Sequence, residues 1–164
     1  MSVEPLPGVL AVAVDIASRL EGIDVSYVIG GSLASSLHGE PRTTLDVDFV
    51  ADLPASAVPR LVKLLEPDYY VDLGAAQEAV RTGGAFNAVH STAGVKVDFF
   101  VAGSDPFDLE RIRTRVAMMV STSPRQTLWM DTAEHTLLRK LEWYRRGGEV
   151  SDRQWRDVVA IVAL

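Results

Sequence analysis

The sequence predicts an α+β fold: a small mixed, twisted β-sheet with helices on one face, followed by a C-terminal helical lobe. Three observations predict it. β-Branched and aromatic runs alternate irregularly with amphipathic helical runs. Two strand-like runs, 86–90 and 95–101, flank a four-residue turn, which favours an antiparallel hairpin. The longest helical run, 132–146, comes late in the chain and is followed by a further helix at 152–164.

The first elements follow from local patterns. Residues 9–20 place apolar side chains at helical spacing, and Gly22 stands where that helix should stop. Residues 25–29 (VSYVI) are β-branched or aromatic and predict a strand, which Gly30-Gly31 breaks. These segments define a helix, a strand and a glycine turn in that order.

The later elements are justified in the same way. We expect Ser32 to cap a short helix at 33–37. Residues 45–51 (LDVDFVA) alternate apolar and acidic side chains, as a strand with two different faces does. Proline or glycine marks most of the remaining ends. Besides the segments already given, a helix opening at Pro54 and closing at Pro67, a helix at 75–80 and strands at 69–71 and 115–120 are expected.

Composition excludes several classes of protein. The 164 residues suit one compact unit, which we divide into a catalytic domain at 1–125 and a helical appendage at 126–164. The chain has no cysteine, so disulfides and thiolate metal sites are excluded. No apolar run reaches the roughly 20 residues of a membrane helix, and no secretion signal opens the chain. We therefore expect a cytoplasmic protein with no membrane partner.

The charges are unevenly placed. Residues 1–105 contain 14 acidic and 6 basic side chains, and residues 106–164 contain 8 and 10. This skew is a weak signal for a polyanionic partner of the C-terminal half. The chain ends in the apolar run VVAIVAL without a capping signal, which favours a longer native chain or a partner that packs there.

Three aspartates form the pattern that carries chemistry. Asp46 and Asp48 are two residues apart on an expected strand, so their side chains share one face. Asp98 lies between apolar neighbours on a second expected strand. If the two strands are neighbours, three carboxylates converge, and oxygen ligands of this kind select Mg²⁺. Two such ions can clamp an in-line phosphoryl displacement.

The glycine turn supplies the second half of the pattern. Gly30, Gly31 and Ser32 follow a strand and precede a helix. Glycine lets the backbone approach a phosphate closely, and a helix N-terminus offers free N–H groups. Gly-Gly-Ser or Asp-x-Asp alone is common in ordinary turns and exposed strands. Their combination in this order is much more specific.

With these residues the sequence resembles the nucleotidyltransferase superfamily that has the DNA polymerase beta-like catalytic fold. The family pattern is Gly-Gly-Ser or Gly-Gly-Ala, Asp-x-Asp about a dozen residues later, and a third acid on a later strand. The fuller string AxxxxGxxRxTxDxD, which includes Arg42, is closer to the branch of bacterial abortive-infection toxin nucleotidyltransferases and uncharacterised relatives. The resemblance covers residues 8–102 well and is thinner beyond them.

The resemblance implies transfer of a nucleoside monophosphate from an NTP, such as ATP, to an acceptor hydroxyl or phosphate. Asp46, Asp48 and Asp98 would be the catalytic residues and would hold two Mg²⁺ ions, with Mn²⁺ as a substitute. Gly30, Gly31, Ser32, Arg42 and Lys140 would contact the nucleotide. Gln154 stands where the toxin branch has an acidic residue, so the acceptor chemistry of that branch does not carry over directly.

Three functions remain open from the sequence. The leading one is an enzyme that modifies RNA, such as a tRNA end, or a protein, in a toxin–antitoxin or stress setting with an antitoxin or other protein partner. The second is a nucleotidyltransferase for a small molecule of the aminoglycoside kind. The third is a non-catalytic nucleotide-sensing or partner-binding module, against which the presence of all three carboxylates counts.

Overall fold

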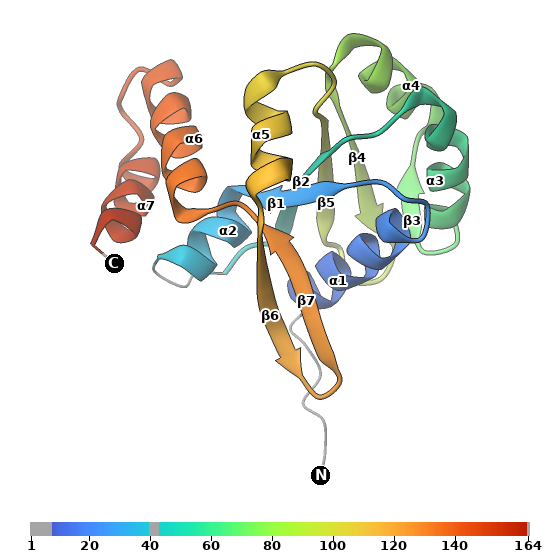
Figure 1. Ribbon diagram of the computed structural model, residues 1–164, viewed down its shortest axis with the longest axis horizontal. Helices are drawn as coiled ribbons and strands as arrows, with labels where there is room; N and C mark the ends of the chain where they lie inside the picture. The colour runs from blue at the N-terminus through green and yellow to red at the C-terminus, as the bar shows by residue number, and fades with distance from the viewer. Residues whose placement is uncertain (1–7, 40–42, 164) are drawn as a thin grey trace.

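The computed structural model describes residues 8–39 and 43–163 and shows one mixed, twisted sheet with helices around it (Figure 1). The seven strands have the order β3-β4-β5-β2-β1-β7-β6. Their bounds are β1 Tyr27–Gly30, β2 Asp46–Ala51, β3 Tyr69–Val71, β4 Ala85–His90, β5 Lys96–Val101, β6 Val116–Thr122 and β7 Arg125–Met130. The helices are α1 Gly8–Glu21, α2 Gly31–His38, a 3-10 turn Ala55–Ala57, α3 Val58–Leu65, α4 Leu73–Thr82, α5 Pro106–Thr114, α6 Ala133–Arg146 and α7 Asp152–Val162.

The sheet combines both kinds of pairing. β2 lies at its centre, antiparallel to β1 and parallel to β5. β5 and β4 form the expected antiparallel hairpin. The predicted α+β fold with a mixed, twisted sheet is therefore confirmed.

The main core lies on one face of the sheet. Val47 and Phe49 of β2 are fully buried there, and so is Phe99 of β5. The Phe49 and Phe99 rings stack with centroids 5.9 Å apart, and α1, α3 and α4 cover them with their apolar sides. Because side chains alternate along a strand, the acidic residues of β2 are forced onto the other face.

The second face carries a smaller apolar cluster. Val28, Val50 and Ala102 pack there against Ile112 of α5, with Phe100 beside them. α5 was not predicted from the sequence, and it places a helix on the second face of the sheet, although helices were expected on one face only. Its start was readable in retrospect, because Asp105 caps the helix by accepting from Phe107 N–H and Asp108 N–H and is followed by proline.

The last part of the chain departs most from expectation. β7 was not predicted; it pairs in parallel with β1 and in antiparallel with β6, and the β6–β7 hairpin extends away from the other strands (Figure 1). α6 and α7 then form the helical lobe, and α6 packs against α2. Ser151 caps α7 by accepting from Gln154 N–H. The division at residue 125 remains a prediction.

The predicted cap of α2 was wrong. α2 begins at Gly31 with Gly30 as its N-cap residue, so Ser32 lies inside the first turn and does not cap it. The reason is that β1 continues to Gly30, one residue beyond the expected strand, and joins the helix directly.

Candidate active site

The sheet face that carries Asp46 and Asp48 holds a row of aligned residues. The register of the parallel β2–β5 pair places Asp48 directly beside Asp98. On the other side of β2, Gly30 of β1 is the partner of Asp48. Paired residues in neighbouring strands project to the same face, so the carboxylates of Asp48 and Asp98 stand side by side. Asp46 lies on the same face at the exposed start of β2.

Asp48 is strongly perturbed by these surroundings. Burial, followed by repulsion from the carboxylates of Asp98 and Asp46, raises the pKa of Asp48 to about 6. The positive charges of Lys140 and Lys96 oppose this rise. Carboxylates that repel one another in a partly buried position are stabilised by a cation. The row therefore has the electrostatic character of a cation site.

Lys96 lies next to the acidic row. It is the register partner of Asp46 on β5, and its Nζ is 3.0 Å from Oδ2 of Asp98. Within residues 8–39 and 43–163, no three acidic or histidine side chains are gathered tightly enough to form a complete metal-binding group. The structure thus brings Asp48 and Asp98 together and leaves Asp46 on the same face, without closing all three around one point.

The two glycines allow backbone and side chains to approach closely. Gly31 has φ +62°, and a Cβ there would lie 1.7 Å from Oδ2 of Asp48. A Cβ at Gly30 would lie 2.5 Å from a guanidinium nitrogen of Arg111 and 2.8 Å from Oδ2 of Asp131. Only glycine fits either position, because these distances are far below van der Waals contact. The N-terminus of α2 therefore sits directly against the Asp48 carboxylate.

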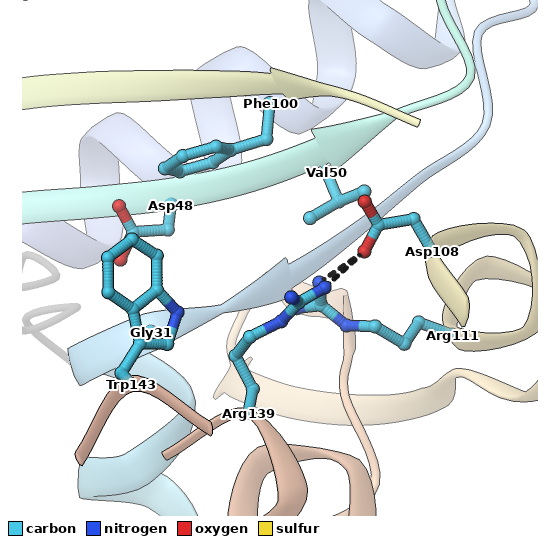
Figure 2. A pocket seen from close by; sticks show the side chains of 8 residues that line it. All are labelled: Gly31, Asp48, Val50, Phe100, Asp108, Arg111, Arg139 and Trp143. Atoms are coloured by element: carbon cyan, nitrogen blue, oxygen red, sulfur yellow. Dashed lines mark hydrogen bonds and ion pairs between the residues drawn. The ribbon is translucent and has the colours of Figure 1, made fainter. Parts of the chain in front are cut away.

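A cleft opens in front of this turn, between the sheet and α6 (Figure 2). Its larger part, of about 310 Å³, we call the apolar compartment; Val50, Phe100 and Trp143 line it together with charged groups. The adjoining polar compartment, of about 160 Å³, is lined by Ser32, Thr136, Lys140 and Gln154 among others. Both compartments share four residues: Gly31, Asp48, Arg139 and Trp143.

Solved structures with this arrangement of sheet and helices exist, although no family model and no curated protein matches the chain. An antigenic nucleotidyltransferase-like protein from Paracoccidioides brasiliensis superposes with a TM-score of 0.67 at 21% identity, over 95% of this chain and 74% of that one. The chain has the nucleotidyltransferase fold. The fold predicted from the glycine turn and the aspartates is confirmed.

Two further structures share the nucleotidyltransferase fold with this chain. The lincosamide antibiotic adenylyltransferase LnuA, bound to lincomycin, gives a TM-score of 0.56 at 12% identity and covers 91% of this chain and 93% of its own. The candidate nucleotidyltransferase TM1012 from Thermotoga maritima gives 0.56 at 18% identity, over 89% and 91% of the two chains. At these identities the likeness concerns the fold.

The nucleotidyltransferase fold places the remaining predicted nucleotide contacts as follows. Ser32 lies in the first turn of α2 and lines the polar compartment. Lys140 of α6 lines it too, and its Nζ donates to Oδ2 of Asp157 at 2.9 Å. Arg42 lies outside the described residues. Ser32 and Lys140, which are far apart in sequence, therefore line the same compartment as Gly31 and Asp48.

Sequence reasoning missed the ionic network behind the cleft. Arg111 of α5 is buried; its Nε donates to Oδ1 of Asp131 at 3.0 Å and its Nη1 to Oδ1 of Asp108 at 2.8 Å. Arg139 of α6 donates to the same Asp108 oxygen at 2.7 Å. Nε2 of His38 lies 2.6 Å from the Asp131 carbonyl oxygen. Arg111 and Asp108 are only three residues apart on α5. The other partners are 20 to 93 residues apart, so no local pattern could have revealed how they connect.

None of the helices among the described residues is long and apolar enough to span a membrane.

Proposed function

We propose that this chain is a metal-dependent nucleotidyltransferase, which moves a nucleoside monophosphate from an NTP to an acceptor and releases pyrophosphate. The observation that carries the proposal is the position of Asp48. Its carboxylate stands beside Asp98 in register and against the backbone of Gly31, at the mouth of a cleft. A partly buried carboxylate with two further carboxylates beside it is costly for the fold, and a role in the cleft explains it best.

The donor set at this place fits a hard divalent cation. Asp46, Asp48 and Asp98 offer only carboxylate oxygens, which Mg²⁺ and Mn²⁺ prefer. The raised pKa of Asp48 reflects its burial first and then the negative charges of Asp98 and Asp46. Lys96, bonded to Asp98, is the nearest competitor for those charges and is itself partly exposed. We propose that these three aspartates hold the catalytic ions. Two ions are expected, as the sequence suggests.

Such ions, when bound, would neutralise charge on the transferred phosphoryl group. The chain's own groups then bind and orient the substrate. The N–H groups at the start of α2 and the Ser32 hydroxyl can donate to triphosphate oxygens. Lys140 adds a positive charge in the same compartment, where Asp157 holds its Nζ in place. We propose that Asp98, next to Asp48, accepts the proton of an acceptor hydroxyl, as the family resemblance implies.

The acceptor divides the proposal into two branches. The leading branch takes RNA, such as a tRNA end, or a protein, and would place the chain with a toxin–antitoxin or other regulatory partner. The second branch takes a small molecule. It is supported by the fold likeness to LnuA, an antibiotic adenylyltransferase, which extends over nearly the whole of both chains.

The decisive experiment is incubation with each labelled NTP and Mg²⁺ or Mn²⁺, with total RNA, total protein or a set of aminoglycosides and lincosamides as acceptors. Label in RNA or protein supports the first branch, and label in a small molecule supports the second. Chelation of the metal should abolish transfer in either case. If no NTP binds in the presence of metal, the enzyme proposal fails and a non-catalytic module is favoured.

Asp48→Asn tests the mechanism within the active chain. Removing one carboxylate from a metal-assisted site should lower kcat by about a hundredfold or more, in line with the loss of a charge-stabilising group in other enzymes. Asp52→Asn is the matched control, because Asp52 lies just past the end of the same strand and is exposed. Equal activity of Asp48→Asn and the parent chain would refute the mechanism.

A further inference from the structure

The cleft has two parts with different chemistry, and the proposed function uses only one of them. The polar compartment contains the hydroxyl of Ser32 and the ammonium of Lys140. Asp157 accepts one of the three N–H donors of Lys140, and the others can still donate to a triphosphate. The apolar compartment begins at the same Gly31–Asp48 wall and extends over Val50 and Phe100. A ligand seated at the turn can therefore reach both compartments at once.

The arginines of the apolar compartment are not available as a phosphate clamp. Arg111 binds Asp131 with two nitrogens and Asp108 with the third. Arg139 donates to Asp108 and to Glu142. Each guanidinium is thus matched by carboxylates at 2.5–3.2 Å. This compartment consequently has charged walls without a surplus of positive charge, and it favours an uncharged ligand group over a phosphate.

Trp143 supplies the aromatic surface of the compartment. It follows Arg139 by one helical turn on α6, and Figure 2 shows its ring turned into the cleft toward Asp48. The residue is 49% exposed, although it is the largest aromatic side chain on this wall. Val50 and Phe100 of the sheet form the apolar surface across from it. An exposed indole above an apolar floor suits a flat ring that can stack.

We propose that the apolar compartment binds the base of the NTP and that Trp143 is its stacking platform, an inference that rests on the proposed function. The triphosphate would then lie in the polar compartment, and the sugar would pass Asp48. Trp143 would contact the base of any nucleotide, because every base offers a stacking face. Trp143 is therefore a substrate-binding residue that determines affinity for the base and contributes little to discrimination among bases.

The test compares ligands with and without a base. Binding of ATP and of ribose 5′-triphosphate, both with Mg²⁺, is measured by calorimetry for the parent chain, Trp143→Ala and Trp143→Phe. Loss of stacking should weaken ATP binding by about tenfold in Trp143→Ala, while ribose 5′-triphosphate binding stays unchanged. Trp143→Phe keeps an aromatic face and should remain within about threefold of the parent chain.

The matched control is Trp155→Ala, because Trp155 on α7 is equally exposed at 49% but does not line either compartment. Its ATP affinity should equal that of the parent chain. The inference is overturned if Trp143→Ala binds ATP normally, or if it loses both ligands equally. The parent chain alone provides a second test: ATP should bind about tenfold more tightly than ribose 5′-triphosphate, and equal affinities overturn the stacking role. Failure of the parent chain to bind either ligand refutes the proposed function itself.

Discussion

Two groups of aspartates lie on either side of the Gly30–Gly31 turn and have opposite electrostatic settings. Asp131 is 1% exposed and is fully matched by Arg111, at the position that a side chain on Gly30 would fill. Asp48 lies where a side chain on Gly31 would be, and its neighbours include two further carboxylates. Two consecutive glycines therefore face two different carboxylates: Gly30 faces Asp131, whose charge is paired, and Gly31 faces Asp48, whose neighbours are other acids.

This difference separates a carboxylate with a structural role, Asp131, from one for which we propose a role in the cleft, Asp48. Asp131 joins the end of β7 to α5 and, through its carbonyl, to α2. Its charge is cancelled inside the protein, so it holds elements together. The charge of Asp48 is compensated only in part, by Lys140 and Lys96, and under the proposed function a bound cation would compensate the rest. Substitutions on the two sides of the turn should therefore affect different properties: stability on one side and activity on the other.

The largest expected effect is on stability, at the Arg111–Asp131 ion pair. Asp131→Ala leaves Arg111 buried with only Asp108 as its partner, and breaking a buried ion pair costs about 3–5 kcal/mol in the free energy of unfolding. Urea denaturation measures this loss. Glu78→Ala is the control, because Glu78 pairs with Arg81 on an exposed surface and the change should be hardly measurable. If the two variants are equally stable, the Arg111–Asp131 pair does not hold the fold together.

The next effect is at the turn itself. Gly31→Ala combines a positive φ with a Cβ that would overlap the Asp48 carboxylate, so we expect a loss of about 2–4 kcal/mol together with loss of nucleotide binding. Gly83→Ala isolates the backbone contribution, since Gly83 has φ +67° and nothing within 4 Å of the added Cβ. Thermal unfolding compares the two variants, and an equal shift in Tm would show that Asp48 does not crowd Gly31.

The smallest effect concerns the cost of the Asp48 charge. Its pKa of about 6 in the fold lies above the usual value near 4 for an unfolded chain. The folded state therefore binds more protons between these values, and stability falls as the pH rises from about 4 to above 6. Without divalent ions, Asp48→Asn should stabilise the chain at pH 7.5 by about 1–2 kcal/mol, after allowance for partial solvent screening.

That gain should vanish at pH 4, where Asp48 is protonated in the folded chain and close to half protonated in the unfolded one. Urea denaturation in the presence of a chelator at the two pH values measures it. Both chains in this comparison keep Asp98, the register neighbour of Asp48. A gain of the same size at both pH values would mean that the substitution acts through packing and not through charge.

Much of the fold was predictable because its signals are local. The alternation of LDVDFVA fixed both the strand and the face on which Asp46 and Asp48 lie, and the glycine pair fixed the turn before α2. The hairpin of β4 and β5 was predictable from its turn. By contrast, α5 was missed although its cap was present in the sequence, and β7 was missed because RQTLWM alternates only weakly.

The sequence by itself determined which residues could do the chemistry: a glycine turn that a side chain would obstruct, and carboxylates spaced for one face of a strand. Only the tertiary structure decided which of the many charged residues do not take part, because that depends on partners brought from distant positions. Arg111 and Arg139 form ion pairs with Asp131, Asp108 and Glu142. Trp143, by contrast, is turned into the cleft (Figure 2). The face of a strand on which a side chain lies follows from its position among neighbouring residues in the sequence. Which charges are paired depends on how whole helices and strands pack together, and no short sequence pattern predicts this.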